Sequence, residues 1–61
     1  MSAKVLVVDD DQATREGLKQ ILDNSGFHAI TAATFQQAVH TIRAADPDLL
    51  IVDVRLGEYN G

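Results

Sequence analysis

The sequence predicts an α/β domain, in which a parallel β-sheet alternates with helices along the chain. Two observations lead to this prediction. Short apolar runs typical of buried strands alternate with segments whose apolar residues recur every three or four positions. The stretch between successive runs is also long enough for a helix, which a parallel crossover requires. With 61 residues the chain has room for one compact unit, and the predicted order is β-α-β-α-β.

The first strand and the first helix are marked by residue type. Residues 5–8, Val-Leu-Val-Val, are apolar throughout, as in strands that are buried on both faces. Asp11 is suited to cap the next helix, since its carboxylate can accept from backbone N–H groups one turn ahead. Gly26 stands where a left-handed residue closes the last turn. The stripe of this helix recurs at steps of three and four: Thr14, Leu18, Ile21, Leu22 and Ser25.

The second half of the chain repeats this pattern. Residues 27–32 are predicted to form a second strand, and Thr34 and Gln37 a capping box in which each side chain serves the other's backbone N–H. Pro47 ends the second helix, because the residue before a proline resists the helical conformation. Residues 49–52, Leu-Leu-Ile-Val, are the predicted third strand. The stripe of the second helix is Phe35, Ala38, Val39, Ile42 and Ala45.

The composition excludes several classes of function. The chain has no cysteine, which rules out disulfides and thiolate zinc sites. Nine acidic residues against five basic ones give a net charge of −4. Such a field repels phosphate backbones and anionic lipid, so we expect no nucleic-acid or membrane binding by this segment. The longest apolar runs are four residues, far short of a membrane span, and we expect a cytoplasmic protein.

Acidic residues follow two of the three predicted strands. Asp9 and Asp10 come after the first strand, and Asp53 comes after the third. Ligand sites of open α/β sheets lie beyond the carboxyl ends of the strands, so these carboxylates converge if the two strands are neighbours. Crowded carboxylates repel one another, and a bound cation relieves that repulsion. Oxygen ligands without histidine or cysteine favour Mg²⁺ or Mn²⁺.

Motifs along the whole chain share a specific spacing. They are Val5-Leu-Val-Val-Asp-Asp-Asp11, Arg15 with Leu18 and Leu22, Gly26-Phe27, Ala32-Ala33, Pro47-Asp-Leu-Leu-Ile-Val-Asp-Val-Arg-Leu56 and Asn60-Gly61. This combination resembles the first half of a two-component response regulator receiver domain. The resemblance implies a flavodoxin-like, doubly wound parallel sheet, of which residues 1–61 supply three strands in the order 2-1-3. The family's switch hydroxyl, lysine and aromatic residue fall beyond residue 61, so we expect a truncated receiver.

The resemblance also implies the roles of individual residues. Asp53 would accept a phosphoryl group from a histidine kinase or a phosphotransfer protein. Asp10 and Asp53 would bind Mg²⁺ directly, Asp9 mainly through water, and the backbone carbonyl of Arg55 would be the remaining protein ligand. We therefore expect a signalling module and not an enzyme. One departure is Gly57, where receivers usually carry a proline, and it leaves the loop that presents Arg55 more mobile.

Two other functional classes stay open. A phosphohydrolase of the haloacid-dehalogenase type has Asp-x-Asp after its first strand, and Asp9 and Asp11 satisfy that spacing, although Ala13 stands where such enzymes carry Thr or Val. The alternative is a non-catalytic association module. The apolar third strand would be an exposed edge in a half-sheet, which predicts self-association, with a two-fold homodimer as the simplest closed form.

The remaining side chains of note are predicted to be either exposed or packed, with no part in the site. Arg15 and Glu16 are expected on the exposed flank of the first helix, and Phe27 and Phe35 in apolar packing. His28 opens the second strand, and His40 lies on the side of the second helix away from its apolar stripe, so both are expected on the surface.

Overall fold

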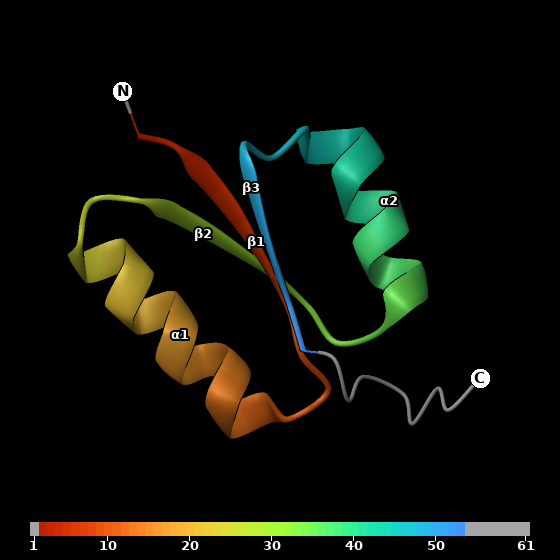
Figure 1. The fold of residues 1–61 in the computed structure, drawn as a ribbon, viewed down its shortest axis with the longest axis horizontal. Helices are drawn as coiled ribbons and strands as arrows, with labels where there is room; N and C mark the ends of the chain where they lie inside the picture. The colour runs from red at the N-terminus through yellow and green to blue at the C-terminus, as the bar shows by residue number, and fades with distance from the viewer. Residues whose placement is uncertain (1, 54–61) are drawn as a thin grey trace.

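The structure, a computed structural model, describes residues 2–53 and contains the five predicted elements in the predicted order. The three strands form a parallel sheet in the order β2-β1-β3, and the two helices cover opposite faces of it (Figure 1). This arrangement confirms the expected half of a flavodoxin-like sheet. The elements are β1 (Lys4–Val8), α1 (Gln12–Asn24), β2 (His28–Ala32), α2 (Phe35–Ala45) and β3 (Leu49–Val52).

The core is built around β1, the central strand. Its four apolar residues are each 1% exposed or less, as expected for a strand covered on both faces. Side chains alternate between the faces, and Leu6 and Val8 pack with residues of β2 and α2. The apolar cluster on that face comprises Leu6, Val8, Ala32 and Ala38, with Ile30 packed against it.

Both ends of α1 are closed as the sequence predicts. Asp11 Oδ2 accepts from the Thr14 backbone N–H at 2.9 Å and from the Thr14 hydroxyl at 2.6 Å. At the other end Gly26 has φ of 96°, in the left-handed region that glycine enters without strain. The Phe27 N–H then donates to the Leu22 carbonyl at 3.0 Å, which satisfies a free carbonyl of the last turn. This bond holds Phe27 in the turn, so β2 begins one residue later than predicted.

The cap of α2 differs from the predicted capping box in one bond. The Gln37 N–H donates to Thr34 Oγ1 at 3.1 Å, as expected. Gln37 Oε1, however, accepts from the Ala33 N–H at 2.9 Å, one residue before the predicted donor. The helix ends at Asp46, whose φ of 51° is left-handed, and Pro47 follows it. Aspartate tolerates this conformation better than most residues, so the helix ends without a glycine.

Three assignments of side-chain exposure are wrong, and three are confirmed. Arg15 is half-buried, because it shares the sheet-facing line of α1 with Leu18 and Leu22 at helical spacing. Phe27 and Phe35 are 41% and 61% exposed, so neither lies in the core; they are found at the turn after α1 and in the first turn of α2. Glu16, His28 and His40 are exposed, as predicted.

The strand β3 forms one edge of the sheet. Leu49, Leu50 and Val52 are 56%, 46% and 45% exposed, and no strand within residues 2–53 pairs with the outer side of β3. The predicted exposure of this apolar edge is therefore confirmed for the described part of the chain. Neither of the two described helices is both long and apolar enough to cross a membrane.

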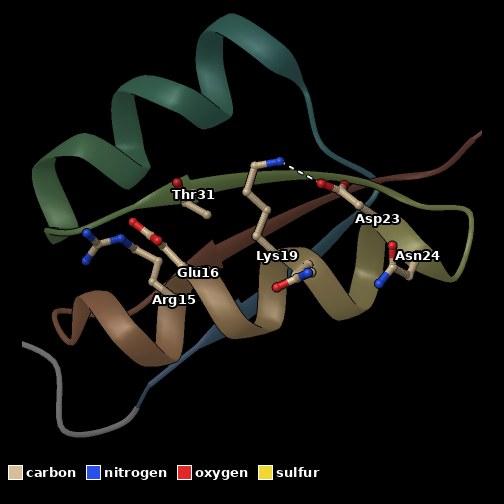
Figure 2. A pocket seen from close by; sticks show the side chains of 7 residues that line it. Arg15, Glu16, Lys19, Asp23, Asn24 and Thr31 are labelled. Atoms are coloured by element: carbon tan, nitrogen blue, oxygen red, sulfur yellow. Dashed lines mark hydrogen bonds and ion pairs between the residues drawn. The ribbon is translucent and has the colours of Figure 1, made fainter.

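Asp23 connects the end of α1 to the start of β2. Its Oδ2 accepts from Lys19 Nζ at 2.6 Å (Figure 2), and its Oδ1 accepts from the Ala29 N–H at 3.1 Å. The hydrogen bond from Lys19, followed by that from Ala29, lowers the pKa of the Asp23 carboxyl. A carboxyl whose pKa is lower in the folded state stabilises the fold above its unfolded pKa. That contribution is lost as the pH falls through the folded value.

We predict that Asp23→Asn lowers the free energy of unfolding at pH 7, because it removes the charge that both donors favour. The difference from the wild type should shrink as the pH falls below about 3.9, the ordinary pKa of Asp, because the carboxyl of the unfolded chain and then that of the folded chain becomes neutral. Urea unfolding between pH 7 and pH 3 measures both quantities. Glu16→Gln is the matched control, since it removes one carboxylate from the same helix without touching β2. A difference that grows in acid would contradict the prediction.

Candidate functional site

The pairing of β1 with β3 brings the predicted site residues together. Val8 and Val52 are partners in the parallel register, so the residues that follow them leave the sheet side by side. The hydrogen-bond ladder continues one residue further, because the Asp53 N–H donates to the Val8 carbonyl at 3.0 Å. The Asp9 N–H likewise donates to the Ala32 carbonyl at 3.1 Å. The backbones of both acids are therefore fixed by the sheet.

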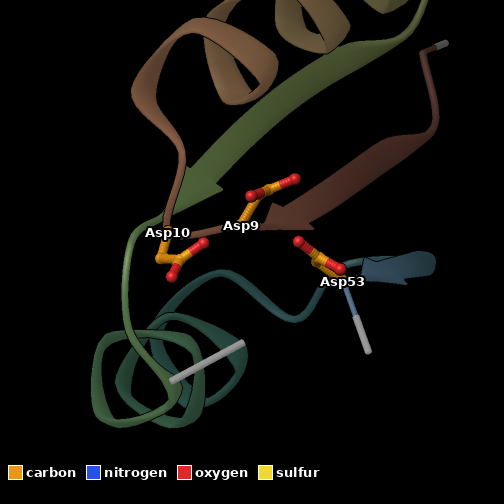
Figure 3. A group of neighbouring side chains, drawn as sticks. All are labelled: Asp9, Asp10 and Asp53. Atoms are coloured by element: carbon orange, nitrogen blue, oxygen red, sulfur yellow. The ribbon is translucent and has the colours of Figure 1, made fainter. Parts of the chain in front are cut away.

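Asp9, Asp10 and Asp53 form one acidic cluster beyond the carboxyl ends of β1 and β3 (Figure 3). One carboxylate oxygen from each residue can be chosen so that all three lie within 4.8 Å of one another. Their exposure is graded: Asp9 is 5% exposed, Asp53 is half-buried and Asp10 is exposed. The cluster thus has a buried floor and a side that opens to solvent.

The turn between β1 and α1 is held by two hydrogen bonds to Asp9. Its Oδ1 accepts from the Asp11 N–H at 2.9 Å. Its backbone carbonyl accepts from Arg15 Nη1 at 2.9 Å. One bond thus fixes the side chain of the buried acid and the other fixes its peptide group, so the acidic turn is tied to the first turn of the helix.

The donor set of the cluster fits a hard divalent cation. All three side chains offer carboxylate oxygens, and the cluster includes no histidine or cysteine. Magnesium usually takes one or two carboxylates and keeps several waters, which suits a cluster that is open on one side. The predicted carbonyl ligand Arg55 and the departure at Gly57 lie outside the described residues.

The three consecutive acids have separate tasks. Asp9 and Asp10 belong to the cluster, whereas Asp11 caps α1 through Thr14. A haloacid-dehalogenase site needs the first and third acids of this run to face the same ligand. Since Asp11 Oδ2 is engaged by two donors of Thr14, the structure does not favour that alternative.

Arg15 is the one residue near the site whose place sequence reasoning misassigned. Its spacing from Leu18 and Leu22 already put it on the line of α1 that meets the sheet. A charged side chain on such a line needs a polar partner, and the carbonyl after β1 is the partner within reach. Helical spacing was therefore the signal that could have found it.

Comparison with known proteins agrees with this geometry. The profile of the response regulator receiver domain matches residues 5–61. The chain belongs to this family. It is 36% identical, over its whole length, to the alkaline phosphatase synthesis transcriptional regulatory protein PhoP of Bacillus subtilis. It is 38% identical, again over its whole length, to the response regulator MprA of Mycobacterium tuberculosis and of Mycobacterium bovis.

Membership of the receiver family supports a phosphoacceptor role in two-component signalling, and the two alternative classes are not favoured. The chain covers 25% of the Bacillus relative and 26% of each mycobacterial one, about a quarter of their length. The similarity therefore concerns the receiver region of those regulators.

We predict that Asp10→Ala weakens Mg²⁺ binding far more than Asp11→Ala. Loss of a cluster carboxylate should cost on the order of tenfold or more in affinity, as disturbance of metal-site residues usually does. Loss of the cap should instead lower the free energy of unfolding by about 0.5–2 kcal/mol. Calorimetric titration with Mg²⁺ and urea unfolding of both variants separate the two effects. Equal losses of affinity would refute this division between the acids.

Proposed function

We propose that this receiver accepts a phosphoryl group on Asp53 from the phosphohistidine of a histidine kinase or a phosphotransfer protein, with Mg²⁺ at the acidic cluster. The observation that carries the proposal is the convergence of Asp9, Asp10 and Asp53 at the carboxyl edge of the sheet. Family membership supplies the reaction class, and the cluster supplies a place for it in this chain.

Asp53 is the best placed of the three acids to be the acceptor. Its backbone is held to β1 through the Val8 carbonyl, and its side chain is half-buried, so it combines a fixed position with access for a donor. Asp9 is almost fully buried and has one oxygen engaged by the turn. Asp10 is exposed and lies in the turn itself, which suits a cation ligand better than an acceptor.

The transfer is a single displacement at phosphorus. An oxygen of Asp53 forms a bond to phosphorus while the phosphorus–nitrogen bond of phosphohistidine breaks, and the imidazole leaves with the electron pair. The product is an acyl phosphate on Asp53. Mg²⁺, when bound, neutralises the charge that develops on the phosphoryl oxygens. Asp10 and Asp53 would hold the cation directly and Asp9 mainly through water, and the carbonyl of Arg55 would complete the protein ligands.

The product of this step stays attached to the chain. Each chain takes up one phosphoryl group and does not release it as part of a catalytic cycle, which is the behaviour of a signalling module and not of an enzyme. The proposal includes a cytoplasmic location. It also assigns residues 1–61 to the N-terminal part of a receiver domain, in keeping with the half-sheet β2-β1-β3.

We predict that Asp53→Asn abolishes phosphorylation by a small phosphodonor in the presence of Mg²⁺, because the amide cannot form the acyl phosphate. Asp48→Asn is the matched control. Asp48 lies just before the opposite end of β3, where its Oδ2 accepts from the Lys4 N–H, and this change should leave uptake unaltered. Intact-mass measurement of the full chain gives the phosphorylated fraction. Unchanged uptake by Asp53→Asn would assign the acceptor to another residue.

We also propose a second copy of the chain as the partner of the exposed β3 edge. Support comes from the unbroken apolar run of β3 and from its exposed Leu49, Leu50 and Val52. In a two-fold dimer the β3 strands of the two copies pair with each other, which satisfies the unpaired backbone N–H and C=O groups of both. We predict a concentration-dependent dimer in analytical ultracentrifugation, and Leu50→Lys should shift it to monomer by placing like charges at the interface. A wild type that stays monomeric at all concentrations would refute this partner.

A further inference from the structure

Arg15 connects the first helix to the acidic turn through a single contact. Its side chain extends from α1 on the side of the helix that faces β2, the strand that carries Thr31 (Figure 2). Its guanidinium Nη1 donates to the backbone carbonyl of Asp9 at 2.9 Å, in a part-buried position. That carbonyl belongs to the peptide group that joins Asp9 to Asp10. Arg15 therefore contacts the backbone between Asp9 and Asp10, the two cluster residues in the turn after β1.

This peptide group sets the direction of Asp10. No hydrogen bond within the described residues holds the carboxylate of Asp10, which is exposed, so its backbone determines where it points. The preceding peptide is fixed by the bond from the Asp9 N–H to the Ala32 carbonyl, and the Asp9–Asp10 peptide itself is held by the bond from Arg15 to its carbonyl. Without Arg15 the carbonyl would be free to turn towards water, and the Asp10 side chain would turn with it.

We infer that Arg15 is a positioning residue for the cation site: it holds the Asp9–Asp10 peptide so that both carboxylates face Asp53. The inference rests on the proposed function, since it concerns the same cluster. It goes beyond that function because it assigns a part in cation binding to a residue that carries positive charge and contacts no cluster carboxylate in this structure.

The sign of the effect separates positioning from simple electrostatics. A guanidinium near a cation site repels the cation, so removing its charge should tighten binding if charge were its only effect. Removing a positioning contact should instead weaken binding, because Asp10 then has to be ordered when the cation binds. The same substitution thus gives opposite changes in affinity under the two explanations.

The test uses Arg15→Met, which keeps an unbranched side chain and removes both the charge and the donor. We expect Mg²⁺ affinity, measured by calorimetry on the full chain, to fall on the order of tenfold. Arg15→Lys keeps a donor and the charge and should recover part of the affinity. Lys19→Met is the matched control: it removes a positive charge one turn further along α1, where Lys19 pairs with Asp23, and should leave affinity unchanged.

A second readout needs no cation. The backbone amide resonances of Asp10 and Asp11 in nitrogen-15 spectra of the metal-free protein should move in Arg15→Met and stay in place in Lys19→Met. Arg15→Gln, which retains one amide donor, replaces Arg15→Met if the latter loses its helical circular dichroism. A wild type that binds Mg²⁺ together with an Arg15 variant of equal or higher affinity would overturn this inference alone. A wild type that binds no Mg²⁺ would overturn the proposed metal site and this inference with it.

Discussion

The site depends on one backbone interaction, the hydrogen bond from the Asp53 N–H to the carbonyl of Val8. It extends the parallel ladder of β1 and β3 by one residue beyond the strands and fixes an acid that is distant in sequence beside Asp9. The ladder is itself held in place by the burial of β1 on both faces, since a shift of one residue would move each apolar side chain to the opposite face, where the packing is not shaped for it. The position of the three carboxylates is thus set by apolar packing.

The turn that follows β1 divides three consecutive acids between stability and chemistry. The first, Asp9, points inwards and is anchored at both its side chain and its carbonyl; the third, Asp11, closes the helix. Asp10 and Asp11 are both exposed, but of these two only Asp10 belongs to the cluster. The repulsion between these like charges would be greater if all three faced the same space, and the turn reduces it by directing Asp11 to the helix cap, so that only Asp9 and Asp10 join Asp53. Helix capping and a cation site are therefore compatible within three residues.

Element order, sheet class and the acidic cluster could be predicted because each leaves a local mark in the sequence: unbroken apolar runs for the strands, cap residues for the helices, and acids at the strand ends. The resemblance supplied the strand order. The exposed fraction of each side chain could not be predicted from the sequence. Phe35 fits the apolar stripe of α2, yet it is 61% exposed, because coverage depends on which elements surround the first turn of the helix. The half-buried position of Arg15 was missed for a related reason. Its charge was taken to indicate an exposed side chain, whereas its helical spacing from Leu18 and Leu22 places it on the face of α1 that meets the sheet.

The central position of β1 also has a kinetic consequence. Pairing β1 with β2 closes a loop that contains only α1, whereas pairing β1 with β3 closes a longer loop that includes α1, β2 and α2. Doubling a flexible loop adds about 0.6 kcal/mol to the entropic cost of closure, and contacts between residues distant in sequence slow folding. Asp53 joins the cluster only through β3, so a complete site requires this more distant pairing. Affinity for a cation is consequently a measure of how completely this half-sheet has folded.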